Sequence, residues 1–276
     1  MSLKEIAKKN RLKIAFTLLL LLLEAGITLL FPLFIGNAID DAVNTNHSGA
    51  INLGLLSLIA LVIGVGRRVF DSRFYAKMYQ NVGSNTISKM QDASSSLKSA
   101  RLSMIGEFVE FLENSFPELV SNVIGLVGLI VIIFTLNQPV FYGSLIVTCI
   151  IFLIYWVTSK RTITLNKSSN DEFEKQVDIL SKNSESELLL HLKKMMKWNI
   201  KLSDLEAANF SISWIVLSVF LVLSILISVD GGAIKYGALF ALVMYVFQYM
   251  ESVINLPIFY QNWLRLREIK NRMQSI

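Results

Sequence analysis

Six apolar stretches, each close to the length needed to cross a bilayer, dominate this sequence of 276 residues. A membrane-spanning helix needs about 20 mostly apolar residues. The stretches occupy residues 14–36, 51–66, 119–136, 140–158, 210–229 and 233–258. The composition agrees, because 53% of the residues are hydrophobic and only 17% are charged, against about 25% charged in soluble domains. We therefore predict an all-α polytopic membrane protein and exclude a disordered chain or a typical cytosolic enzyme.

The cationic residues fall almost entirely on one side of these predicted spans. Of the 26 Lys and Arg residues, 25 lie in segments 1–13, 67–118, 159–209 and 259–276, and the opposite side holds only Lys235. Loops rich in Lys and Arg stay in the cytoplasm. The pattern predicts a multi-pass protein of the cell (inner) membrane with both termini cytoplasmic. The net charge of +5 is then a topology signal, and we expect no nucleic-acid partner.

The two long inner segments are predicted to be helical rather than disordered. Phe74, Met78 and Val82 recur every four residues, which is typical of one helical face. Spans two to five would then continue as helices into the cytoplasm and pair as two hairpins, at about 67–118 and 159–209. Twenty extra residues would reach about 30 Å beyond the membrane. The alternative is that these segments form a separate small domain.

The predicted domain organisation follows from these segments. Residues 1–13 would form a cytoplasmic interfacial helix, residues 14–258 the six-helix transmembrane domain, and residues 259–276 a cytoplasmic tail. Arg67 and Arg68, which follow the short second span, are expected to snorkel to the lipid headgroups. Gly54, Gly64, Gly66, Gly125 and Gly128 are expected to be close-packing positions.

Enzymatic and metal chemistry are not expected of this chain. The only cysteine is Cys149, and the two histidines, His47 and His191, lie far apart. A disulfide framework within the chain is therefore excluded, and a metal site is not expected. His191 is expected to be solvated or to face the lipid headgroups rather than to be a ligand. A phosphate-cradling G-x-x-x-x-G-K-[ST] sequence is missing from the 276 residues. We expect no cofactor in this chain, and any ATP hydrolysis would belong to a separate subunit.

Two local patterns accompany the six-helix topology. Residues 24–40, EAGITLLFPLFIGNAID, hold an apolar run, a proline, a glycine and a final Ile-Asp, and Gly106-Glu107 follows the first predicted hairpin tip. In these features the chain resembles the transmembrane domain of ABC exporters, in the group that lacks a fused ATP-binding domain. The resemblance implies an exporter-type fold and a dimer with a second copy or a close homologue. It also implies a separate cytosolic ATPase subunit, which would bind and hydrolyse ATP.

The hairpin tips are the places where the resemblance puts an ATPase partner. In the family the second tip commonly presents an aromatic residue, and residues 181–186 contain none. The docking candidates are the polar residues of the two tips: Ser94, Ser95, Ser96, Asn183, Ser184 and Glu185.

Polar side chains inside the apolar stretches are the candidates for a translocation path, since such residues are expensive in lipid. They form three stripes: Glu24 and Thr28, then Glu118 and Asn122, then Gln248, Glu251 and Asn255. Three carboxylates with no Lys or Arg at their depth would favour a cationic or hydrogen-bonding cargo. The alternative is structural: these groups bond across helices, and Glu118 pairs with Arg67 or Arg68.

The sequence therefore predicts a membrane transport permease, dimeric and dependent on a separate ATPase. One alternative is a pore or an ion-coupled carrier that works without an ATPase, using Glu24 and Glu251. The other is a membrane scaffold or regulator that binds a cytosolic partner through the hairpin tips.

Overall fold

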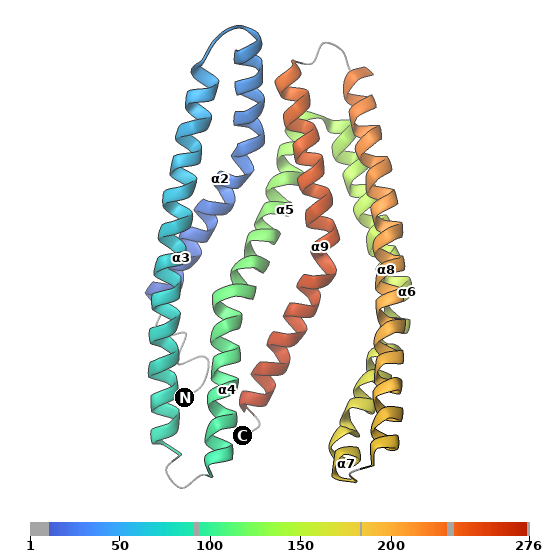
Figure 1. Ribbon diagram of the computed structural model, residues 1–276. Coiled ribbons are helices and arrows are strands. Elements are labelled where there is room, and N and C mark those ends of the chain that lie inside the picture. The colour runs from blue at the N-terminus through green and yellow to red at the C-terminus, as the bar shows by residue number, and fades with distance from the viewer. Residues whose placement is uncertain (1–10, 91–93, 183, 231–234, 275–276) are drawn as a thin grey trace. The chain divides into compact units, whose positions relative to one another are not determined.

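A computed structural model describes residues 11–90, 94–182, 184–230 and 235–274, and these form helices joined by short connections (Figure 1). The elements are α2 (Arg11–Val43), α3 (Ser48–Ser88), α4 (Ser95–Glu110), the π-helical turn η1 (Phe111–Ser115), α5 (Phe116–Leu136), α6 (Gln138–Glu174), α7 (Gln176–Ser181), α8 (Glu185–Asp230) and α9 (Tyr236–Gln274). Most of the interfacial helix predicted for residues 1–13 lies outside the described residues.

Six helical stretches in the described residues are long and apolar enough to cross a membrane. They lie in α2, in α3, in the continuous α4–η1–α5 helix from Arg101, in α6 with α7, in α8, and in α9 up to Leu256. This confirms the prediction of an all-α polytopic membrane protein. α3 has 41 residues and is about 60 Å long, twice the hydrocarbon thickness. The helical extensions predicted beyond the spans are therefore present.

The chain divides into two compact units, residues 1–138 with 228–276, and residues 139–227. In the first unit, α2 packs against α3, α5 and α9, and α4 packs against α3 (Figure 1). The α3–α4 contact has a buried apolar core, which confirms the predicted helical face on α3. Its members are Phe74, Tyr75, Met78, Val82, Ile105 and Val109.

One turn of π-helix joins α4 to α5 without breaking the long helix. The Phe116 N–H bonds the Phe111 carbonyl, five residues back. Pro117 follows directly; a proline ring has no N–H and clashes with the carbonyl four residues before it. A wider turn at this point accommodates the proline inside a continuous helix.

In the second unit, α6 and α8 are joined by polar and apolar contacts. The Asn209 amide donates to the Thr158 hydroxyl at 3.0 Å. Leu217 and Phe220 are buried on the same face of α8, and the Phe220 ring lies against Gly143 of α6, where a side chain would collide with it. The pair is thus held by both close packing and interhelical hydrogen bonding.

We expect the Asn209–Thr158 hydrogen bond to contribute a modest coupling energy to this helix pair. A double-mutant cycle with Asn209→Ala, Thr158→Ala and the double variant should give about 0.6 kcal/mol, the average for such bonds in membranes, and no more than about 1.7 kcal/mol. Unfolding in mixed detergent micelles provides the measurement. Additive effects of the two substitutions would contradict an energetic role for the bond.

Candidate functional site

An ion pair between the first two helices lies at the predicted path residue Glu24. The Arg67 guanidinium of α3 donates through Nε to the Glu24 carboxylate of α2. It also donates through Nη1 to Asp71, one turn further along α3, at 3.1 Å. The Arg67 side chain is only 15% exposed, so both contacts lie largely out of solvent.

A buried hydrogen bond extends this network. The Thr17 hydroxyl of α2 donates to Asp71 Oδ1 at 2.8 Å, and both residues are 3% exposed. Asp71 therefore receives one bond from a hydroxyl and one from a guanidinium, as a buried carboxylate requires. Glu24, Arg67, Asp71 and Thr17, the α2–α3 polar network, tie the two helices together.

The network corrects two expectations from the sequence. Arg67 does not snorkel away from the helix pair, and a cation does reach the depth of Glu24. The physical reason is that the carboxylates of Glu24 and Asp71 both bind Arg67 within the helix pair, and a buried charge requires such partners. The pairing favours the structural interpretation of Glu24 over its use in a translocation path.

The remaining path candidates are not joined to one another. The Thr28 hydroxyl donates to the Glu24 carbonyl at 2.9 Å, and the Asn122 amide donates to the Glu118 carbonyl at 2.8 Å. Both bonds stay within one helix. Across the described part of the chain, no hydrogen bond or ion pair links the three predicted stripes, although α2, α5 and α9 pack against each other.

Glu251 and Glu118 differ from Glu24, whose carboxylate is paired with Arg67. Both are exposed in this single chain, whereas Gln248 and Asn255 are half-buried. Glu118 lies at the start of the apolar run in α5, and Glu251 lies inside the candidate span of α9. The alternative that Glu118 pairs with Arg67 or Arg68 is wrong. Arg67 binds Glu24 and Asp71 instead, and Arg68 forms no ion pair among the described residues.

The α2 segment from Leu29 to Asp40 forms the surface that receives α9. The buried Tyr245 hydroxyl donates to the Leu29 carbonyl at 2.6 Å, close to Pro32, which interrupts the helical hydrogen bonding of α2. Gly36 meets Gly237 backbone to backbone, with no room for a side chain. Beyond the crossing, Asp40 accepts the Gly237 N–H at 2.8 Å.

Only some of the glycines predicted to pack closely do so within the chain. A Cβ atom at Gly128 would collide with the Leu29 side chain. At Gly54, Gly66 and Gly125 an added Cβ atom would meet nothing within 4 Å. For these three the prediction of close packing within the chain is wrong, because each faces open space rather than a neighbouring helix.

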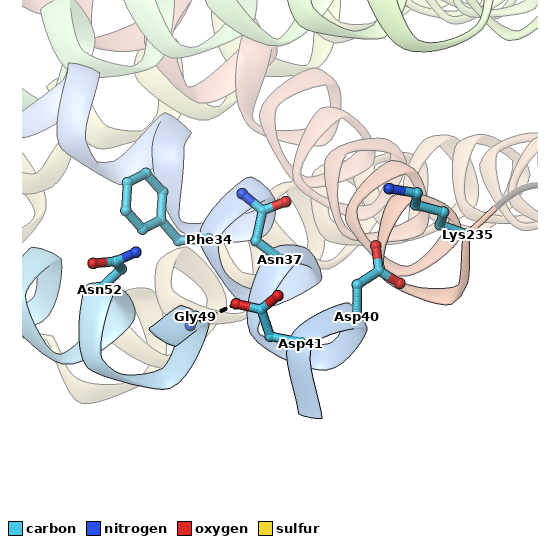
Figure 2. Close-up of a pocket in the computed structure, with 7 residues that line it drawn as sticks. All are labelled: Phe34, Asn37, Asp40, Asp41, Gly49, Asn52 and Lys235. Carbon is cyan, nitrogen blue, oxygen red and sulfur yellow. Dashed lines mark hydrogen bonds between the residues drawn. The ribbon is translucent and has the colours of Figure 1, made fainter. Parts of the chain in front are cut away.

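A polar pocket of about 330 Å³ lies beside this crossing (Figure 2). Asn37, Asp40 and Asp41 of α2 line it together with Asn52 of α3 and Lys235. The carboxylates are partly used for structure: Asp41 Oδ2 accepts the Ser48 hydroxyl at 2.7 Å and the Gly49 N–H at 2.8 Å. The pocket therefore coincides with the capping of two helix N-termini.

The described tip residues lie at helix starts. Ser95 and Glu185 are the first residues of α4 and α8, and Ser94, Ser95 and Glu185 are exposed. Ser184 is half-buried, and its hydroxyl lies 3.2 Å from that of Ser186. Asn183 and the side chain of Ser96 lie outside the described residues. Docking of a partner at these tips stays a prediction.

His191 of α8 is buried rather than solvated, which corrects the expectation from the sequence. It is 2% exposed, and its Nδ1 lies 3.1 Å from the Glu172 carboxylate of α6. The other oxygen of the Glu172 carboxylate accepts a hydrogen bond from the Lys175 ammonium at 3.1 Å. Although Lys193 and Lys194 follow it closely in the sequence, His191 is buried, because Glu172 of α6 provides a carboxylate partner for its ring.

Comparison with known families adds to this geometry. A family model described as the ABC transporter transmembrane region matches residues 3–237, which is most of the chain. This chain belongs to that family. No curated protein matches the chain.

Membership in the ABC transporter transmembrane region family confirms the resemblance seen in the sequence and, at a coarse level, a role in membrane transport. The match contains the Glu24–Asp40 pattern and Gly106-Glu107, and it ends at the second residue of α9. Gln248, Glu251 and Asn255 lie beyond it.

Sequence reasoning missed several residues that organise this ABC transporter transmembrane region. Arg67 and Asp71 stand one helical turn apart just after an apolar run, which is a recognisable signal for an ion pair on a helix. Gly237 and Tyr245 carry no such signal, because their partners on α2 are about 200 residues away in the chain.

Proposed function

We propose that this chain is the transmembrane subunit of an exporter-type transporter, which works as a dimer and takes its energy from a separate ATPase. The observation that carries the proposal is Glu251. It is exposed on α9, although the candidate span of α9 is the most buried of the six. A charged side chain inside a span costs about 2.5–3.5 kcal/mol on insertion scales, so it needs a water-filled path or a second subunit beside it.

Dimerisation would supply that environment. Two six-helix copies, or one copy and a close homologue, would enclose a pathway between them, with Glu251 and Glu118 at its wall. Their negative charges would favour a cationic or hydrogen-bonding cargo. Glu24 and Thr28 are less suited to this role because the Glu24 carboxylate is already held by Arg67.

The proposal also covers the source of energy for transport and the orientation of the chain in the membrane. The 276 residues contain no phosphate-cradling G-x-x-x-x-G-K-[ST] sequence, so ATP would be bound and hydrolysed outside them. The ATPase would dock at the exposed tips near Ser95 and Glu185. We place the Lys- and Arg-rich side, with both termini, in the cytoplasm of the cell membrane.

Purification of the intact complex from native membranes tests this function. A mildly solubilised, affinity-tagged chain should bring down a second copy or homologue, together with a protein that carries the phosphate-cradling motif. The complex should hydrolyse ATP. A chain that purifies without any nucleotide-dependent partner and without ATP turnover would overturn the ATPase-dependent version.

An ion-coupled carrier is the second candidate, and the exposure of Glu251 favours it as well. In that case purified chain alone would dissipate an imposed ion gradient in proteoliposomes, and Glu251→Gln would reduce the flux. Glu187→Gln is a suitable comparison, since Glu187 pairs with Lys182 at the second tip. Equal flux in both variants would remove Glu251 from the mechanism.

A further inference from the structure

A groove of about 380 Å³ is lined by residues of α2 and α3, within the first unit. Its apolar lining residues, here called the floor, include Gly66, Val69 and Phe70 of α3. Phe74 also lines the groove, and Lys13, Arg73 and Lys77, here called the rim cations, complete its lining. The groove therefore combines an apolar floor with a cationic rim.

The groove extends across the membrane border predicted from the start of the first apolar run and the end of the second. Lys13 directly precedes the first apolar run, and its ammonium lies 5.8 Å from the centre of the Phe74 ring. Phe74 is therefore level with the border of the α2 span. Gly66 lies eight residues earlier in α3 and so about 12 Å deeper, at the end of the second apolar run.

The cations of the rim are not neutralised by the protein. Arg67, which is also on α3, is compensated by Glu24 and Asp71. By contrast, no carboxylate within the described residues forms an ion pair with any of the three rim cations. Arg73 uses one donor internally, from Nη1 to the Val69 carbonyl at 3.2 Å, and its side chain is exposed.

The deep end of the groove has free space. An added Cβ atom at Gly66 would meet nothing within 4 Å, and Val69 beside it is 46% exposed. In a bilayer this space would be filled by hydrocarbon chains, because the apolar floor offers no hydrogen-bonding group to water.

We propose that this groove is a binding site for an anionic phospholipid of the leaflet on the Lys- and Arg-rich side. The phosphate lies between Lys13, Arg73 and Lys77, and one acyl chain runs along Phe70 toward Gly66. Basic pockets between transmembrane helices bind anionic headgroups in this way. A lipid bound there would contact both α2 and α3. The proposal does not depend on the proposed ATPase.

Lipid titration of the purified full chain, followed by native mass spectrometry, tests the site. The probes are phosphatidylglycerol and phosphatidylcholine with the same acyl chains, with inorganic phosphate as a competitor. We expect the first phosphatidylglycerol to bind at least about tenfold more tightly than phosphatidylcholine, since each nearby cation adds to the attraction. Inorganic phosphate at millimolar concentration should not displace it.

Two variants separate the headgroup and acyl-chain contributions. K13Q/R73Q/K77Q should bring the two lipids to within about twofold, and Gly66→Leu, which keeps every charge, should also weaken phosphatidylglycerol binding. The matched control K160Q/R161Q/K167Q removes three cations from α6 and should retain the preference.

Three results would overturn the proposal. The first is an unchanged preference in K13Q/R73Q/K77Q, and the second is an equal loss in the α6 control, which would indicate general attraction to a positive surface. The third is displacement by inorganic phosphate together with no effect of Gly66→Leu, which would indicate a headgroup-sized anion site without a lipid tail.

Discussion

Arg67→Gln is expected to destabilise this protein by about 3 kcal/mol or more, the largest effect of any single substitution that we propose. Removal of one partner from a buried ion pair leaves the other charge uncompensated. Here two carboxylates depend on the same guanidinium, and the Asp71 side chain is 4% exposed and the Glu24 side chain 28%. The free energy of unfolding in mixed micelles, followed by tryptophan fluorescence, measures the loss.

The neighbouring arginine provides a matched control for this prediction. Arg68 is exposed and forms no ion pair among the described residues. Arg68→Gln removes the same charge and should change stability by no more than about 0.5 kcal/mol. Addition of Glu24→Gln and Asp71→Asn to Arg67→Gln should restore much of the loss. Equal effects of the two arginine substitutions would show that the network contributes little.

Gly36→Ala is expected to be the second most damaging change, with a loss of about 1–3 kcal/mol. Its new methyl group would fall on the Gly237 carbonyl and close to Ala241. Backbone atoms cannot rotate away, so α2 and α9 would have to separate. The separation would weaken the hydrogen bond that the Gly237 N–H donates to the Asp40 carboxylate.

Gly26→Ala is the matched control, because Gly26 lies on the same helix and an added Cβ atom there meets nothing within 4 Å. Alanine is a better helix former than glycine by about 1 kcal/mol, so Gly26→Ala should leave stability unchanged or raised. The same micellar unfolding assay compares the two variants. If Gly36→Ala were as stable as Gly26→Ala, the close crossing of α2 and α9 would not be a constraint on the fold.

The glycine and aspartate of the α2 pattern acquire a physical meaning from this crossing. In the sequence, residues 24–40 could only be recognised as similar to a family pattern. In the structure, Gly36 provides the room for Gly237, and Asp40 caps the start of α9. Leu29 contributes a carbonyl to Tyr245. Three residues of the pattern therefore form a docking surface for α9.

The hydrophobic periodicity of the sequence was enough to predict the helices, because a span needs only length and apolar character. Phe74, Met78 and Val82 also revealed their buried face, since residues four apart lie on one side of a helix. The polar residues were less predictable. Glu24 appeared to be free in the sequence, because its partner Arg67 lies 43 positions away.

The sequence by itself determined the number of spans, the helical extensions beyond them and the family pattern, because these depend on local composition and spacing. The tertiary structure decided which charges are neutralised and which are free. Arg67 meets two carboxylates, His191 meets one, and Lys13 lies over the Phe74 ring. The physical reason is that electrostatic pairing acts over a few ångströms in space, and only helix packing fixes those distances.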